Sequence, residues 1–177
     1  MRSLNTRQFL YIFLCISLSS CFSIWRKEEP LTEYRPILMA RESLERSIVL
    51  RSPAKIESPA KIYYKDKYIF ISERFKGVHI IDNTDPKNPI NRGYVSVPGC
   101  VDMALKENTL YVDNATDLVA IDLISLTSST VRITKRIREV FSEAAPPDSR
   151  ALPNIYNKEN RPKNSIIIGW TKEKGSL

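Results

Sequence analysis

Residues 62–82, IYYKDKYIFISERFKGVHIID, decide the fold, and residues 101–122, VDMALKENTLYVDNATDLVAID, repeat their pattern. Both segments alternate short apolar runs with polar turns, which predicts antiparallel strands joined by tight connections. The offset between the two segments is 40 residues at Ile81 and 41 residues at Ile69, so one turn differs by a single residue. A repeat of about 40 residues with three or four short strands is typical of β-propeller blades.

Turn residues follow the last strand of each segment. Asp82 and Asp122 end these strands, where a carboxylate can accept hydrogen bonds from the backbone of the next turn. Asp85, Pro86 and Pro89 shape the turn after the first segment. We expect these five residues to be structural. We expect no metal site, because neither Asp-rich turn, at residues 82–85 or 113–117, has the ligand spacing or the glycine of an EF-hand loop.

The run Gly-Val-His-Ile-Ile-Asp at residues 77–82, followed by Asp-Pro-Lys-Asn-Pro at 85–89, resembles the LVIVD repeat family. This family is a propeller-like group of secreted and lipid-anchored bacterial proteins. The resemblance covers residues 61–133, and the second segment lacks the two prolines of the turn. It implies an architecture rather than an activity, because the biochemical activity of the family is mostly undefined.

The predicted fold is mainly β: an incomplete β-propeller with two antiparallel propeller-type blades, an orphan C-terminal strand and one short helix. Residues 36–60 contain two short strands around one helical turn, then a linker. Within 52–62 the motif Ser-Pro-Ala-Lys-Ile occurs twice. Because proline interrupts strand pairing, we expect the first copy to be a connector and the second to lead into a strand.

Residues 61–134 hold the two repeat units, and residues 135–164 hold a short helix and a long loop. The helix is predicted from apolar residues at helical spacing, namely Ile133, Ile137, Val140 and Phe141. Residues 165–177 form the orphan strand. Two units fall short of the four to eight blades of a propeller, so we expect either a truncated member or sheets supplied by another subunit, and favour truncation.

Residues 1–20 predict a lipoprotein signal peptide. Arg2 and Arg7 precede a ten-residue apolar run, which is too short to cross a membrane, since a spanning helix needs about 20 residues. Leu-Ser-Ser-Cys at 18–21 resembles the lipobox of bacterial lipoproteins. The resemblance implies cleavage between Ser20 and Cys21, followed by a diacylglycerol and an N-acyl chain such as palmitate on Cys21. An ordinary signal peptide is the alternative.

The predicted location is the bacterial cell envelope, with residues 21–35 as a tether. Position 22 is Phe rather than the Asp that commonly signals inner-membrane retention, which favours the outer membrane. Removing residues 1–20 takes away two arginines, leaving 25 basic and 20 acidic residues, a net charge of +5. For a protein outside the cytoplasm this charge favours a membrane surface over nucleic acid. The densest basic group is expected to be a solvated face; it comprises Arg132, Lys135, Arg136 and Arg138.

Catalytic motifs are absent from the sequence: there is no Gly-x-Ser-x-Gly, Gly-rich phosphate loop, His-Glu-x-x-His or Cys-x-x-Cys. His79, the only histidine, aligns with Val119 and is expected to pack in a strand. Cys100 is expected to be a buried, unreactive thiol.

We therefore expect no enzyme and no cofactor beyond the lipid, but a lipid-anchored binding or scaffold module. Its expected partners are the membrane and an envelope protein or glycan. The alternatives are a gene fragment without independent function and a propeller-type envelope enzyme in which His79 would be the candidate base.

Overall fold

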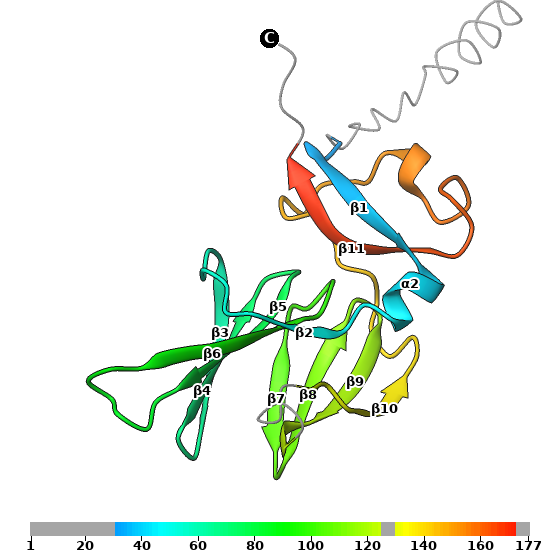
Figure 1. The fold of residues 1–177 in the computed structure, drawn as a ribbon. Coiled ribbons are helices and arrows are strands. Elements are labelled where there is room, and N and C mark those ends of the chain that lie inside the picture. The colour runs from blue at the N-terminus through cyan, green and yellow to red at the C-terminus, as the bar shows by residue number, and fades with distance from the viewer. Residues whose placement is uncertain (1–30, 125–129, 173–177) are drawn as a thin grey trace, which may run out of the picture.

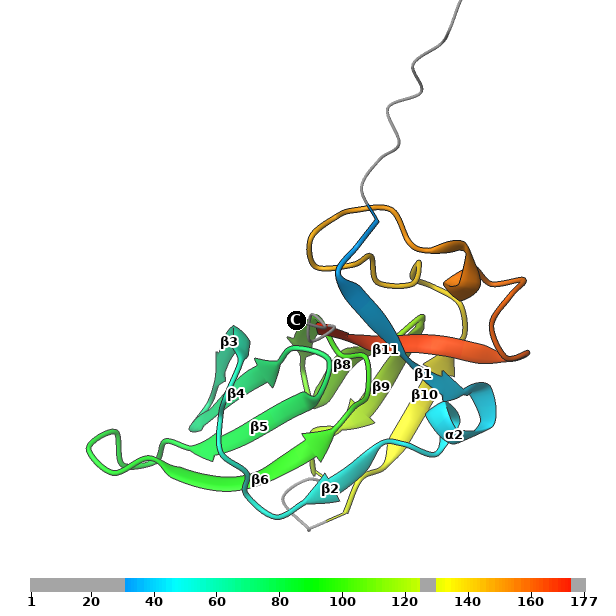
Figure 2. The same cartoon turned by 90° about the horizontal axis from the view of Figure 1, so that it is seen from above.

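The computed structural model describes residues 31–124 and 130–172, whose strands form three antiparallel sheets (Figures 1 and 2). The five-stranded sheet has the order β2-β6-β5-β4-β3, the four-stranded sheet the order β10-β9-β8-β7, and the third pairs β1 with β11. The predicted cleavage and lipidation residues, Ser20 and Cys21, lie outside the described residues. Among residues 31–124 and 130–172, no helix has the length and hydrophobicity needed to span a membrane.

The first repeat unit supplies four strands of the five-stranded sheet. They are β3 (Pro59–Lys65), β4 (Tyr68–Glu73), β5 (Gly77–Asp82) and β6 (Ile90–Ser96), and β2 (Val49–Arg51) adds the edge next to β6. β3 begins at the proline of the second Ser-Pro-Ala-Lys-Ile copy, as expected. The repeated pattern alone does not predict β6, which follows the proline-rich turn.

The second unit forms the four-stranded sheet from β7 (Met103–Lys106), β8 (Thr109–Asn114), β9 (Asp117–Asp122) and β10 (Ile133–Ile137). β4 ends in a pair between Glu73 and Gly77, whereas β8 ends in a pair between Asn114 and Asp117. Three residues therefore connect the first pair and two connect the second. This turn accounts for the change of offset between the two units.

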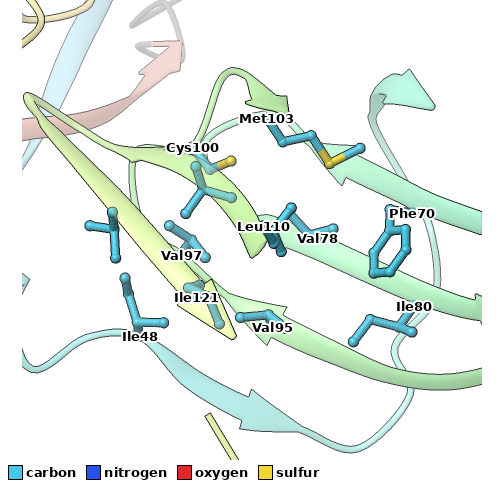
Figure 3. Close-up of a cluster of buried hydrophobic side chains, with 12 residues drawn as sticks. Ile48, Phe70, Val78, Ile80, Val95, Val97, Cys100, Met103, Leu110 and Ile121 are labelled. Carbon is cyan, nitrogen blue, oxygen red and sulfur yellow. The ribbon is translucent and has the colours of Figure 1, made fainter. Parts of the chain in front are cut away.

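The inner faces of the two sheets pack together in one hydrophobic core (Figure 3). We call inner face the side of each sheet that enters this core, and outer face the opposite side. In both sheets the inner-face residues alternate along the strands, as the two-residue period of a β-strand requires. The fully buried members are Val78, Val95, Val97, Cys100, Leu110, Val119 and Ile121.

The helix predicted after Ile133 is wrong, because residues 133–137 form the edge strand β10, paired with β9. Residues four apart share a face in a strand as well as in a helix, so Ile133 and Ile137 fit both structures. The free edge of β9 decides between them. An α-helix, α2 (Arg41–Glu45), lies between β1 (Tyr34–Ala40) and β2, where one helical turn was expected.

The C-terminal strand is not an orphan. β11 (Ser165–Lys172) pairs along its length with β1, from Tyr34 opposite Lys172 to Ala40 opposite Ser165. Leu31, within the segment predicted as tether, forms a β-bridge with Ala151. A short 3-10 helix, η1 (Asn154–Tyr156), lies in the long loop before β11. None of the three sheets closes on itself.

Candidate functional site

A cleft of about 560 Å³ lies on the outer face of the four-stranded sheet. Tyr111 and Leu118 belong to this face, because their neighbours along β8 and β9 point into the core. The remaining apolar wall comes from three other segments: the β4–β5 turn with Phe75, residues 141–145 with Phe141, and β11 with Ile167. The volume of the cleft lies in the range of ligand-binding pockets, roughly 300–1,000 Å³.

Two interlocked turns place Phe75 at the cleft. The Phe75 amide donates to the Cys100 carbonyl (2.6 Å), and the Gly99 amide donates to the Phe75 carbonyl (3.0 Å). Gly99 has a φ of +80°, and a side chain there would meet the backbone of Ala115 at 2.8 Å. Only glycine therefore suits this close approach.

Of the two carboxylates that line the cleft, Asp102 is exposed and Asp113 is half-buried. Asp113 accepts hydrogen bonds from the amides of Val101 (2.9 and 3.0 Å) and Asp102 (2.8 Å). Burial raises the pKa of Asp113 despite these donors. Backbone amides thus use the hydrogen-bonding capacity of this carboxylate, and these hydrogen bonds fix the bend before β7.

Cys100 lies behind this bend and is fully buried, as expected for a small packing residue. Its Sγ lies 3.6 Å from the Asp102 carbonyl oxygen. Burial raises the pKa of the Cys100 thiol well above its usual range. The thiol therefore stays protonated and is a poor nucleophile.

An ion network around Asp117 holds the segment that bears Phe141. Both oxygens of this fully buried carboxylate lie 2.7 Å from Arg41 Nη1, and one lies 2.8 Å from Arg136 Nη1. The Glu139 amide also donates to Asp117 (3.2 Å), and the Phe141 amide donates to the Thr116 carbonyl (3.0 Å). Burial tends to raise the pKa of Asp117, but the hydrogen bonds from the two arginines outweigh it and lower the pKa.

A second ion pair holds residues 141–145 against β11. Glu143 accepts from the Nη2 of Arg161, whose side chain is 2% exposed, and from the Ile167 amide at 3.2 Å. Glu143 thus joins two walls of the cleft. The cleft is therefore built on sheets and ion pairs rather than on a free loop.

His79 does not line the cleft. It lies on the outer face of the five-stranded sheet, fully buried, with Nε2 2.7 Å from a Glu73 oxygen and its ring 4.7 Å from that of Tyr94. Lys76 also binds Glu73 at 3.0 Å. Burial tends to raise the pKa of Glu73, but the hydrogen bonds from His79 and Lys76 outweigh it and lower the pKa. The arrangement is the packing role expected for this histidine, and nothing in the sequence marks Glu73 as its partner.

The strand-end carboxylates make the backbone hydrogen bonds expected of them. Asp82 accepts from the Thr84 amide and Asp122 from the Ile124 amide, each at 3.0 Å. Hydrogen bonds from the Thr84 hydroxyl and amide, aided by Arg92, lower the pKa of Asp82 to about 2.

Each of these two carboxylates also pairs with an arginine ten residues later, Asp82 with Arg92 and Asp122 with Arg132. This arginine is a feature of the repeat that the apolar pattern does not reveal. It could have been found by comparing polar positions at the 40-residue offset, because Arg92 and Arg132 share it.

Asp85 organises its own turn, accepting from the Lys87 amide (3.0 Å) and the Asn88 side chain (2.9 Å), with Pro86 inside the turn and Pro89 at its end. These carboxylates lie apart from the cleft. Among the described residues no three potential metal-ligating side chains gather into a group.

The basic group after β9 is not simply a solvated face. Arg136, at 13% side-chain exposure, belongs to the buried Asp117 network. Arg132 binds Asp122, and Arg138 binds Glu45 at 2.9 Å. These arginines therefore attach β10 and the following turn to the rest of the fold.

Comparison with known proteins found no matching family model, no matching curated protein and no matching solved structure. The resemblance to the LVIVD repeat family stays a prediction.

Proposed function

We propose that this chain is a lipid-anchored protein of the bacterial cell envelope that binds an apolar segment of a partner protein in the cleft on the outer face of β7–β10. The observation behind this proposal is the lining of the cleft. Phe75, Tyr111, Leu118, Phe141 and Ile167 supply its wall from four separate segments. An apolar, largely preformed concavity favours apolar side chains over a glycan.

The proposed architecture is a pair of propeller-type blades. Support comes from the repeat register, which gives each unit the same four antiparallel strands in the same order. In this arrangement the module is a binding surface rather than an enzyme.

The proposed anchor is a lipid on Cys21. Nine residues separate Cys21 from Leu31, which bridges Ala151. Fully extended, nine residues reach about 30 Å, so the cleft would stay close to the membrane surface. Labelling with radioactive palmitate should modify the full chain, and a Cys21→Ser variant should lose the label. Equal labelling of both would disprove the anchor.

The binding proposal is tested by photo-crosslinking in cells. A photoreactive phenylalanine analogue at Phe141, which is 42% exposed at the cleft, should give a defined adduct with a second protein chain. The same analogue at the exposed residue Lys87 is the control. A Leu118→Asp change should remove the Phe141 adduct, and its thermal midpoint is measured alongside, because the new carboxylate lies opposite Asp113. An adduct that forms equally at Lys87, or that survives Leu118→Asp, would refute binding in the cleft.

A further inference from the structure

Two large apolar side chains stand exposed on the outer face of the five-stranded sheet. Ile62 and Tyr64 on β3 are each 66% exposed. They face the same way as Ile71 and Ile69, their partners on β4, which are only partly covered. Solvent-exposed apolar side chains grouped on a sheet face mark a surface that contacts another molecule.

The second repeat unit has a face equivalent to this one, and that face is covered. At the 41-residue offset, Ile62 corresponds to Met103, and Ile71 corresponds to Val112. Met103 and Val112 are 3% and 1% exposed, because they lie on the inner face of the four-stranded sheet. The outer face of the first unit, which is exposed at Ile62 and Tyr64, is thus equivalent to the buried inner face of the second unit.

The same correspondence applies to the opposite faces. Phe70 and Val78 cover Met103 and its neighbours in the core from the inner face of the five-stranded sheet (Figure 3). Their repeat counterparts are Tyr111 and Leu118, which line the cleft. The core therefore joins the Phe70 and Val78 face of the first unit to the Met103 and Val112 face of the second. The outer face of the second unit is equivalent to the former, and the outer face of the first unit is equivalent to the latter.

We propose that copies of this chain associate head to tail, with Ile62 and Tyr64 of one copy seated in the cleft of the next. This contact repeats the internal pairing of the two sheets between molecules. It is heterologous, because different surfaces of the two copies meet, so copies add to form a ring if the rotation closes and an open filament if it does not. It rests on the proposed function in one respect: it names the protein segment that the cleft binds.

Two features of β3 favour this contact. β3 is an edge strand of its sheet, so no further strand of this chain lies between Ile62 and Tyr64 and the cleft of the next copy. A common lipid anchor would also hold the copies on one membrane, where their effective concentration is high. Lys61 lies on the opposite face of β3 and is paired with Asp102 at 2.6 Å, so it does not stand between Ile62 and the cleft.

The test is disulfide trapping between two differently tagged full-length copies in the membrane. One copy has Tyr64→Cys and the other has Leu118→Cys. Cys100 does not compete, because it is buried. Both copies also carry Cys15 and Cys21, which the proposed processing removes or acylates, and the control below corrects for any disulfide that these two residues form. A copy with Thr84→Cys, in an exposed turn, replaces the Tyr64→Cys copy as the matched control. We expect the Tyr64 and Leu118 pair to give roughly tenfold more mixed dimer than the control, reflecting the higher effective concentration at a specific contact.

A second measurement is the size of the full-length protein in detergent. Ile62→Lys with Tyr64→Lys should shift it to the monomer and leave the thermal midpoint unchanged, because both side chains are exposed. Equal trapping in both cysteine pairs, or unchanged size in the lysine variant, would overturn the proposal. If trapping fails while the Phe141 adduct with another protein persists, self-association is wrong and cleft binding stands. If both fail, both proposals fall.

Discussion

The Asp117 network gives the sharpest test of how this fold is held together. Asp117→Asn keeps the shape of the side chain but removes the charge that faces Arg41 and Arg136, whose side chains are only 20% and 13% exposed. Removing one partner of a buried ion pair costs about 3–5 kcal/mol. Partial exposure of both arginines places the expected loss near ~3 kcal/mol. With a urea slope of about 1.5–2 kcal/mol per molar, the unfolding midpoint should fall by about 1.5–2 M.

The loss of stability in Asp117→Asn should also depend on pH, in a direction set by the pKa of Asp117. The folded pKa of Asp117 lies below its usual value. Its contribution is therefore fully present above about pH 4 and is lost as the pH falls through the folded pKa. Urea unfolding at pH 7 and pH 3 should show the gap between Asp117→Asn and the unchanged chain narrowing in acid.

The matched control is Glu33→Gln, which removes an exposed carboxylate that pairs with Arg150 and Lys172. An exposed pair contributes only about 0–1 kcal/mol. A loss below about 1 kcal/mol for Asp117→Asn at pH 7, or a loss equal to that of the control, would refute the view that this network supports the cleft wall.

Three further changes test other parts of the fold. His79→Val should destabilise the protein by about 1–3 kcal/mol in urea unfolding, because the buried Glu73 loses a hydrogen-bond partner; an unchanged midpoint would contradict this. Cys100 should resist iodoacetamide in the folded protein and react fully in urea, as followed by mass spectrometry, and rapid native labelling would show that it is accessible. Gly77→Ala should cost more than ~2 kcal/mol by thermal unfolding, because its Cβ would overlap a backbone carbonyl oxygen. Gly93→Ala, where the nearest atom is a side-chain methyl group at 3.4 Å, is the control and should be close to neutral.

Local patterns predicted the strands well, because each depends on nearby residues. The runs before Asp82 and Asp122 are apolar at nearly every position, and both form the predicted third strand of a unit. Residues 133–137 show the limit of such patterns. Their spacing suits a helix and a strand equally, so the neighbouring edge of β9 determines the structure.

The cleft could not be predicted from the sequence, since its wall comes from segments far apart in the chain. Phe75 and Ile167 are 92 residues apart, yet both line it. The Arg41 and Asp117 pair likewise joins positions 76 residues apart. A single sequence provides no signal for such pairings. The 40-residue offset between Asp82 and Asp122 shows only which turns of the two units are equivalent.

Pairing between β1 and β11 sets an order on folding. Tyr34 meets Lys172, 138 residues later, so the first strand to emerge during synthesis or export waits for the last one. Contacts between distant residues form slowly, because a long loop must close before they contribute. The two repeat units can assemble while β1 still has a free edge with Ile37, Leu38 and Met39 beside it. A chain interrupted before Ser165 would therefore keep its two repeat units but leave the edge of β1 unpaired. An unpaired edge strand can pair with another chain, so incomplete products would be prone to aggregation.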